Sequence, residues 1–140
     1  MATPRLMEYF NRQPRIGILS TANRDGKVDA AVFGSPQMTY ERTVVMALGE
    51  NRTFEYLREN PSAVFTIVES GKTIADWKGL RVYLWMKEYA TSGEMLETYK
   101  KEVARAVGDE AAKMVHAVVT FEITEVRPLV DMGQGWEGSL

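Results

Sequence analysis

The chain has 140 residues, one histidine, no cysteine and a formal net charge of −2, which suits a single domain spanning residues 1–140 and gives no reason to expect nucleic acid as a partner. The absence of cysteine excludes disulfides and thiolate chemistry. His116 alone cannot build a histidine metal site, so we expect no metal. Any redox chemistry must therefore come from a bound cofactor. No apolar run approaches the ~20 residues of a membrane helix, and residues 1–10 lack the apolar core of a signal peptide, so we expect a cytoplasmic protein without a membrane partner.

The first part of the chain has the pattern of an antiparallel hairpin. A short helix is predicted over Leu6–Asn11, and a strand with an internal glycine follows over Ile16–Ala22. Asp25-Gly26 is a strong hairpin signal, and the partner strand is predicted over Val28–Phe33. The sequence therefore predicts that the first two strands pair antiparallel to each other. Residues 37–40 are predicted as a loop.

A buried strand and a capped helix follow this loop. The β-branched, apolar run Thr43–Leu48 predicts the strand. Gly49 breaks the run, Asn51 has the side chain of a good N-cap, and Pro61 ends the helix. The junction between strand and helix is therefore well defined.

Arg52 makes this junction a candidate anion site. The amino terminus of a helix exposes unpaired N–H groups and carries a partial positive charge. A cation in the first turn opposes that charge by about 0.3–1 kcal/mol, so an anion bound beside Arg52 would offset the cost. Glu50 and Glu55 could neutralise Arg52 instead, and the junction would then be an ordinary capped strand–helix turn.

Two further strands and a loop are predicted in the next part of the chain. A strand of high β-propensity covers Ala63–Glu69, and a loop over residues 70–79 follows it. A long strand then runs from Leu80 to about Tyr89, with alternating faces. The side chains predicted to face the core are Leu80, Val82, Leu84 and Met86. The side chains predicted to face water or a partner subunit are Arg81, Tyr83, Trp85 and Lys87.

A second long helix and a last strand complete the predicted elements. Ser92 is predicted to cap the helix and Gly108 to end it. Its buried stripe is predicted to consist of Leu96, Tyr99, Val103 and Val107. One more helical turn is predicted over residues 109–114 and the last strand over Ala117–Val126, followed by a glycine-rich tail. Six strands interrupted by two main helices predict a mainly β domain, a small antiparallel barrel with helices.

In this order of parts the sequence resembles the FMN-binding split-barrel family, the pyridoxamine 5'-phosphate oxidase-like group. The resemblance covers roughly residues 6–126. It is carried by the hairpin Ile16–Ala22, Asp25-Gly26 and Val28–Phe33, and by the run Val44-Val-Met-Ala-Leu-Gly-Glu-Asn-Arg-Thr that leads into a helix. It implies a six-stranded antiparallel split barrel that binds FMN.

The resemblance also implies which residues bind the cofactor. In the family, a basic residue followed by Thr or Ser at this junction holds the FMN phosphate, which implies this role for Arg52 and Thr53. A guanidinium suits phosphate oxygens because it offers two parallel donors. The second strand, the third strand and the loop after the fourth line the flavin ring, which implies Ala30, Ala31, Val32, Phe33, Met46, Ala47, Leu48, Trp77, Lys78 and Gly79. The small side chains of Ala30 and Ala31 would let a flat ring approach the backbone, although a crowded barrel wall explains them equally well.

A homodimer is a further implication of the resemblance. The family dimerises through its barrel faces and completes each flavin site with residues of the second subunit. We therefore expect the flavin near a dimer interface, with the region around Met114 and the tail residue Trp136 as candidates for the partner's contribution. The exposed aromatic face predicted for residues 80–89 agrees with this expectation.

The expected function is that of a flavin-dependent oxidoreductase. It would pass electrons or hydride between a reduced nicotinamide or small reductant and an acceptor that the sequence does not identify. The family's basic C-terminal signature has only a faint echo in Arg127-Pro128, so pyridoxamine phosphate is not the expected substrate. A non-catalytic FMN-binding electron carrier, or a relative that binds a deazaflavin or haem, remains an alternative.

Asp29 and His116 are two further residues with reactive side chains. Asp29 would act as a base only if its strand buried it, and pairing with a Lys or Arg is the more common role. His116 precedes the last strand and is more often a structural histidine than a catalytic one. The sequence therefore assigns no catalytic residue.

Overall fold

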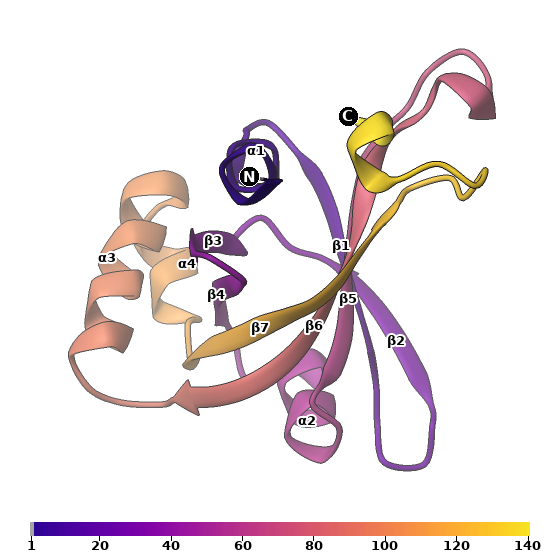
Figure 1. Ribbon diagram of the computed structural model, residues 1–140. Helices are drawn as coiled ribbons and strands as arrows, with labels where there is room; N and C mark the ends of the chain where they lie inside the picture. The colour runs from indigo at the N-terminus through magenta and orange to yellow at the C-terminus, as the bar shows by residue number, and fades with distance from the viewer. Residues whose placement is uncertain (1) are drawn as a thin grey trace.

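The computed structural model describes residues 2–140, in which a strongly twisted sheet is flanked by helices above, below and to the left in Figure 1. The strands are β1 (Ile16–Ala22), β2 (Val28–Val32), β3 (Gln37–Tyr40), β4 (Thr43–Leu48), β5 (Ser62–Glu69), β6 (Lys78–Ala90) and β7 (Ala117–Pro128). The α-helices are α1 (Ala2–Asn11), α2 (Arg52–Glu59), α3 (Glu94–Val107) and α4 (Asp109–Lys113). Two short 3-10 helices, η1 (Ile74–Asp76) and η2 (Trp136–Ser139), precede β6 and follow β7.

The strands form one antiparallel sheet in the order β2-β1-β5-β6-β7-β4-β3. The predicted hairpin is confirmed, because β1 pairs with β2 from Ile18 opposite Val32 to Ala22 opposite Val28. The prediction of six strands was wrong: the described residues form seven. Strands β2 and β3 remain as two separate edges, so the barrel is not closed.

The strand that the sequence did not predict is β3. Its four residues include one buried side chain, Met38, and a single apolar position gives too little alternation to indicate a strand. A contact from a distant helix holds it. The Asn11 side chain at the end of α1 donates from Nδ2 to the Met38 carbonyl oxygen and accepts from the Met38 amide through Oδ1, both at 2.8 Å.

The main core lies between the inner face of the sheet and the helices α1 and α2. Phe10 of α1 and Phe54 of α2 are both buried in it. The predicted alternation along β6 is confirmed, since Leu80 and Val82 are fully buried, whereas Trp85 on the opposite face is 49% exposed. One face of this strand therefore belongs to the core and the other does not.

Helix α3 ends at Gly108 as predicted, but it differs from its prediction at its start and in its buried stripe. Its N-cap is Gly93, with no side-chain cap, where Ser92 was predicted. Leu96 is buried with Val45 and Val118 of the sheet, but Val107 at the end of the predicted buried stripe is 70% exposed. The reason is that the residues of α3 that pack with Val45 and Val118 of the sheet, Leu96 and Tyr99, belong to the first half of the helix.

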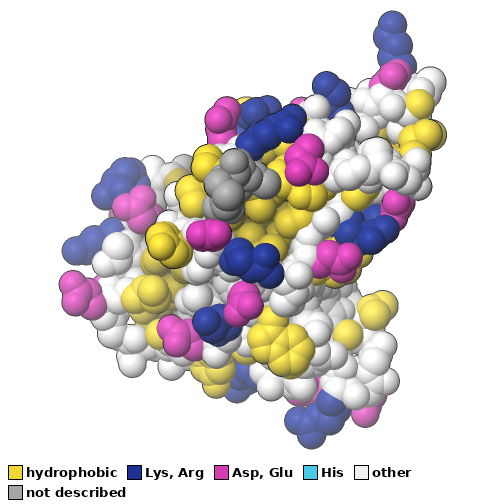
Figure 2. Space-filling view, viewed as in Figure 1, with side chains coloured by type: hydrophobic (Ala, Val, Ile, Leu, Met, Phe, Trp, Pro, Cys, Tyr) yellow, Lys and Arg dark blue, Asp and Glu magenta, His cyan; other side chains and the backbone are white. Residues whose placement is uncertain are grey.

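The surface in the same view carries charges of both signs next to one another (Figure 2). Hydrophobic side chains gather in the middle of this face. Because positive and negative side chains are mixed around them, the face shows no concentration of one sign of charge, in keeping with the small net charge of −2. Within residues 2–140, no helix combines the length and the apolar content that a crossing of the bilayer requires.

Candidate functional site

The junction of β4 and α2 folds as its sequence predicts. Asn51 caps α2 from an extended backbone (φ −135°, ψ 179°), and its Oδ1 accepts a hydrogen bond of 3.0 Å from the amide of Phe54. The amides of Arg52 and Thr53 are the first two of the helix, where no carbonyl one turn back is available to them. Two backbone donors therefore remain at the amino end of α2, where the helix dipole favours an anion.

Arg52 lies at this helix end and faces an acidic residue of β2. Its guanidinium Nη1 is 3.7 Å from Oδ1 of Asp29. The Arg52 side chain is 60% exposed and the Asp29 side chain only 22% exposed. Asp29 thus has the pairing role that its residue type favours, and Arg52 keeps enough exposed surface to meet a ligand.

Two threonines near this end of the fold are buried. Thr53 is 3% exposed, so its hydroxyl does not have the open surface of a solvated helix residue. Thr21 lies opposite Asp29 in the β1–β2 register, and its Oγ1 is buried without a hydrogen-bond partner among the described residues. Because a buried hydroxyl without a partner is costly, Thr21 marks an incomplete polar environment beside Asp29.

On the other side of the junction, the side chain of His116 lies close to the carboxylate of Glu50. The imidazole Nδ1 is 3.9 Å from Oε2 of Glu50, and the ring packs edge-on against Phe54 with centroids 5.6 Å apart. The backbone amide of His116 donates to the Leu48 carbonyl at 2.8 Å. His116 therefore packs beside the start of α2 and contributes to holding this end of β4.

The predicted ring-lining residues differ in their accessibility. On the edge strand β2 and just after it, Ala30 and Val32 are exposed, whereas Ala31 and Phe33 are half-buried. On β4, Met46, Ala47 and Leu48 are buried, because one face of this strand lies in the main core and α3 packs on the other through Leu96. In a single chain, β2 meets Arg52 through Asp29, and its exposed residues Ala30 and Val32 point to the opposite face of the strand.

The remaining predicted residues lie at the opposite end of the sheet. Figure 1 shows α2 at the lower end, and the loop before β6 together with η2 at the upper end. Trp77 is half-buried, Lys78 exposed and Gly79 buried at the start of β6, and Trp136 packs against the main core. One chain therefore brings Arg52, Thr53 and β2 together and keeps Trp77, Lys78, Gly79 and Trp136 apart from them.

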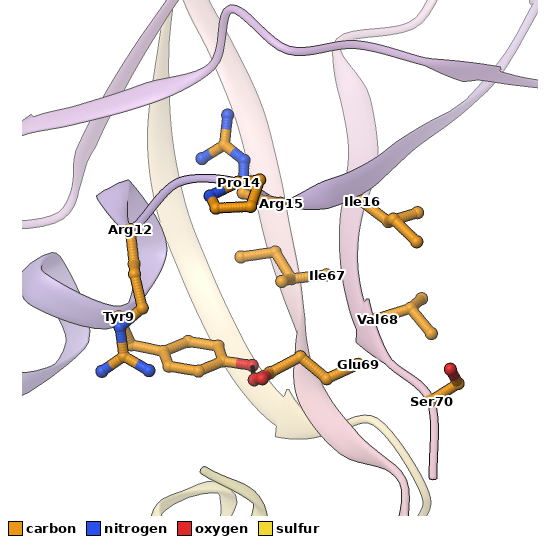
Figure 3. Close-up of a pocket in the computed structure, with 9 residues that line it drawn as sticks. All are labelled: Tyr9, Arg12, Pro14, Arg15, Ile16, Ile67, Val68, Glu69 and Ser70. Atoms are coloured by element: carbon orange, nitrogen blue, oxygen red, sulfur yellow. Dashed lines mark hydrogen bonds between the residues drawn. The ribbon is translucent and has the colours of Figure 1, made fainter.

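A cavity of about 320 Å³ at the upper end was not predicted from the sequence. Figure 3 shows it between α1, the segment that leads into β1, and the end of β5. Tyr9 of α1 donates its hydroxyl hydrogen bond to Glu69 of β5 at the wall of this cavity. Burial, and then the Glu69 carboxylate, raise the pKa of Tyr9 above its ordinary value. These two residues are 60 positions apart, so no local pattern in the sequence could indicate the pair.

We expect the substitution Tyr9→Phe to lower the free energy of unfolding by about 1 kcal/mol at pH 8, because it removes one hydrogen bond. A tyrosine whose folded pKa is raised keeps its full contribution below its ordinary pKa of 10.0, and that contribution falls as the pH rises above it. The difference between the two proteins should therefore shrink at about pH 11. Urea unfolding at both pH values measures it, and an unchanged difference would contradict this assignment.

The fold is that of the split-barrel proteins related to pyridoxamine 5'-phosphate oxidase, as the sequence predicted, with one further strand. No family model and no curated protein matched the sequence. The likeness is to solved structures of low identity, and it establishes the fold.

Three solved structures illustrate this likeness. An FMN-binding protein from Syntrophomonas wolfei subsp. wolfei superposes with a TM-score of 0.74 at 22% identity, over 91% of this chain and 84% of that chain. A pyridoxamine 5'-phosphate oxidase-like protein from Listeria innocua superposes with a TM-score of 0.67 at 15% identity, over 92% and 98% of the two chains. HutZ, the haem storage protein from Vibrio cholerae, superposes with a TM-score of 0.66 at 12% identity, over 90% and 94%.

Proposed function

We propose that this protein is an FMN-binding flavoprotein, with the phosphate at the amino end of α2 and the flavin against β2. The observation that supports it most directly is the capped helix start, where Asn51 leaves the amides of Arg52 and Thr53 free and Arg52 lies exposed beside them. Solved structures with this fold include a protein described as FMN-binding. These residues are therefore the ones that would hold the phosphate.

The chemistry available to the chain favours an oxidoreductase role for the bound cofactor. FMN supplies hydride or electron transfer when bound, and the protein's part is to position it and exclude water. We propose a cytoplasmic reaction in which a reduced nicotinamide or small reductant donates and a second small molecule accepts. The Thr21 hydroxyl supports a bound polar ligand, because it is buried without a partner among the described residues and lies opposite Asp29 on the strand pair against which α2 packs.

The absorption spectrum and the mass of any ligand that copurifies with the protein test this proposal. We expect flavin absorption bands in the purified protein. We also expect FMN to bind the apoprotein in a calorimetric titration. Bleaching by a reduced nicotinamide followed by several turnovers with an acceptor would identify an enzyme, and bleaching without turnover an electron carrier. A haem or deazaflavin spectrum, or a colourless protein that does not bind FMN, would contradict the proposal.

We also propose that the protein is a homodimer, formed through the outer face of the sheet. The outer face consists of the side chains of β1, β2, β5 and β6 that point away from the core. Val28 and Val32 on the edge strand and Ile16 and Trp85 further in are exposed there. A hollow of about 250 Å³ lies between Tyr83, Trp85 and their neighbours on this face. A contiguous group of exposed apolar side chains on one face is typical of an association surface.

A dimer through this face would also account for the separation of the predicted site residues. In one chain, Trp77 directly precedes β6 and Trp136 begins η2, and Figure 1 shows these segments at the end of the sheet opposite α2. A two-fold axis across the sheet would pair opposite ends of the two copies and produce two equivalent sites. Trp136 of one copy would then complete the flavin site of the other, whereas the Met114 region already lies beside Gly49 at the β4–α2 junction of its own chain.

We expect Val32→Asp to convert the dimer into a monomer, because it places a charge within the proposed apolar interface. The molar mass measured by light scattering should fall from about twice 15.8 kDa to the mass of one chain. Val107→Asp on α3 is the matched control, since the two valines are 72% and 70% exposed on different elements. A monomeric unaltered protein, or equal effects of both substitutions, would contradict the proposed interface.

A further inference from the structure

The ion pair between Asp29 and Arg52 places a negative charge next to the proposed phosphate position. An anion bound to the free edge of the Arg52 guanidinium would have the Asp29 carboxylate on the other side of the same group, whose Nη1 is 3.7 Å from Asp29 Oδ1. The two anions would then be separated by roughly 5–7 Å, a distance shorter than the ~8 Å screening length at physiological salt. Repulsion between them is therefore not removed by the solvent.

Asp29 is the acidic residue at this site that the solvent screens least. Its side chain is 22% exposed, whereas that of Glu50, which pairs with His116 on the other side of the junction, is 80% exposed. Exposed charges are strongly screened, and partly buried ones much less. Asp29 therefore dominates the electrostatic cost of bringing an anion to the start of α2.

The same ion pair also orients Arg52, which would favour anion binding. This benefit is small, because a guanidinium that is 60% exposed and 3.7 Å from its partner forms a weak ion pair. The repulsion acts on each negative charge of the ligand, and a phosphate monoester carries nearly two at neutral pH. The repulsive effect is therefore the larger of the two.

We propose that Asp29 is a specificity-determining residue of the flavin site, which weakens binding of the phosphate-bearing flavin and leaves binding of the unphosphorylated flavin unchanged. The inference rests on the proposed FMN site and concerns its selectivity. Asp29 narrows the difference in affinity between FMN and riboflavin. It also makes FMN dissociate faster, because changes in affinity at one site appear mostly in the dissociation rate.

The test compares the apoprotein with Asp29→Asn, an uncharged side chain of the same shape, by calorimetric titration with FMN and with riboflavin. We expect FMN to bind about 3- to 10-fold more tightly to the variant, from Coulomb repulsion across this distance at high effective dielectric. The affinity for riboflavin should change less than 2-fold, which is about the error of the titration, because riboflavin carries no phosphate. Asp29→Ser is a second neutral variant with the same expectation, and thermal unfolding confirms that both are folded.

Glu59→Gln is the matched control. Glu59 pairs with Arg24 at the same distance of 3.7 Å, and it lies at the carboxyl end of α2, away from Arg52. Equal tightening by Glu59→Gln would overturn the proposal, because a general charge effect would then explain the result. FMN affinity that is unchanged or weaker in Asp29→Asn would overturn it and leave the FMN site standing. A failure of the unaltered protein and of both Asp29 variants to bind FMN would overturn the FMN site and this inference together.

Discussion

The substitution Arg52→Ala is expected to weaken FMN binding about 10- to 100-fold, because a charge-assisted contact to phosphate contributes about 1.5–3 kcal/mol. Its effect on the free energy of unfolding should stay within about 0.5 kcal/mol, as for other exposed surface positions. The reason is that Arg52 is 60% exposed and makes one long ion pair, so the fold loses little when it is removed. Calorimetric titration of the apoprotein and urea unfolding measure the two quantities separately.

Arg24→Ala serves as the control for Arg52→Ala. Arg24 is also an exposed arginine in a 3.7 Å ion pair at the lower end of the fold, but its partner is Glu59 rather than Asp29. FMN affinity should be unaffected by it. If Arg52→Ala binds FMN as tightly as the unaltered protein, α2 does not hold the phosphate.

Thr53→Ala is a less selective test than the sequence indicated. The sequence predicted a smaller loss of FMN affinity than for Arg52→Ala, since only a neutral donor is removed. In the structure Thr53 is one of the buried residues of α2 itself. Its removal would therefore lower stability as well as affinity, and the two effects would have to be separated.

The substitution Gly79→Ala is expected to destabilise the protein by about 3 kcal/mol or more, a large part of a typical domain's 5–15 kcal/mol. Gly79 has a φ of +143°, which side chains rarely adopt, and an added Cβ would lie 1.9 Å from the Ile67 carbonyl oxygen. That oxygen belongs to the neighbouring strand β5, which pairs with β6 at this point. The clash is with backbone, so it cannot be relieved by turning a side chain.

Gly26→Ala separates the two causes of this destabilisation. Gly26 also has a positive φ, +84°, but among the described residues other than Gly26 and its two chain neighbours, no heavy atom lies within 4 Å of the position where a Cβ would be added. We expect it to cost about 1 kcal/mol, from the backbone conformation alone. Chemical unfolding of the two variants gives the comparison, and equal losses would show that the contact with Ile67 is unimportant.

The parts of the fold that the sequence predicted are those built from local chemistry. Asp25-Gly26 forms the predicted turn, in which the Gly26 amide donates to the Asn23 carbonyl at 3.1 Å. Asn51 caps α2 through a bond that spans three residues. In both cases the residue type and its immediate neighbours determine the geometry.

The parts that were not predicted depend on contacts between distant residues. β3 is held by Asn11, 27 residues earlier, and nothing in the sequence of residues 37–40 indicates that contact. The candidate site shows the same limit. Arg52 follows from its place after Asn51, but its partner Asp29 follows only from the way α2 packs over the β1–β2 hairpin.

The contact between Asn11 and Met38 has a consequence for how copies of this sheet can join. An uncovered sheet edge is a template for the strand of another molecule. Through its side-chain amide, Asn11 already occupies the Met38 amide and carbonyl on the β3 edge. Among the strands of residues 2–140, β2 alone then presents an edge without such a cover. Extended polymers need two free edges per molecule, so growth by strand addition would stop at two copies joined through β2.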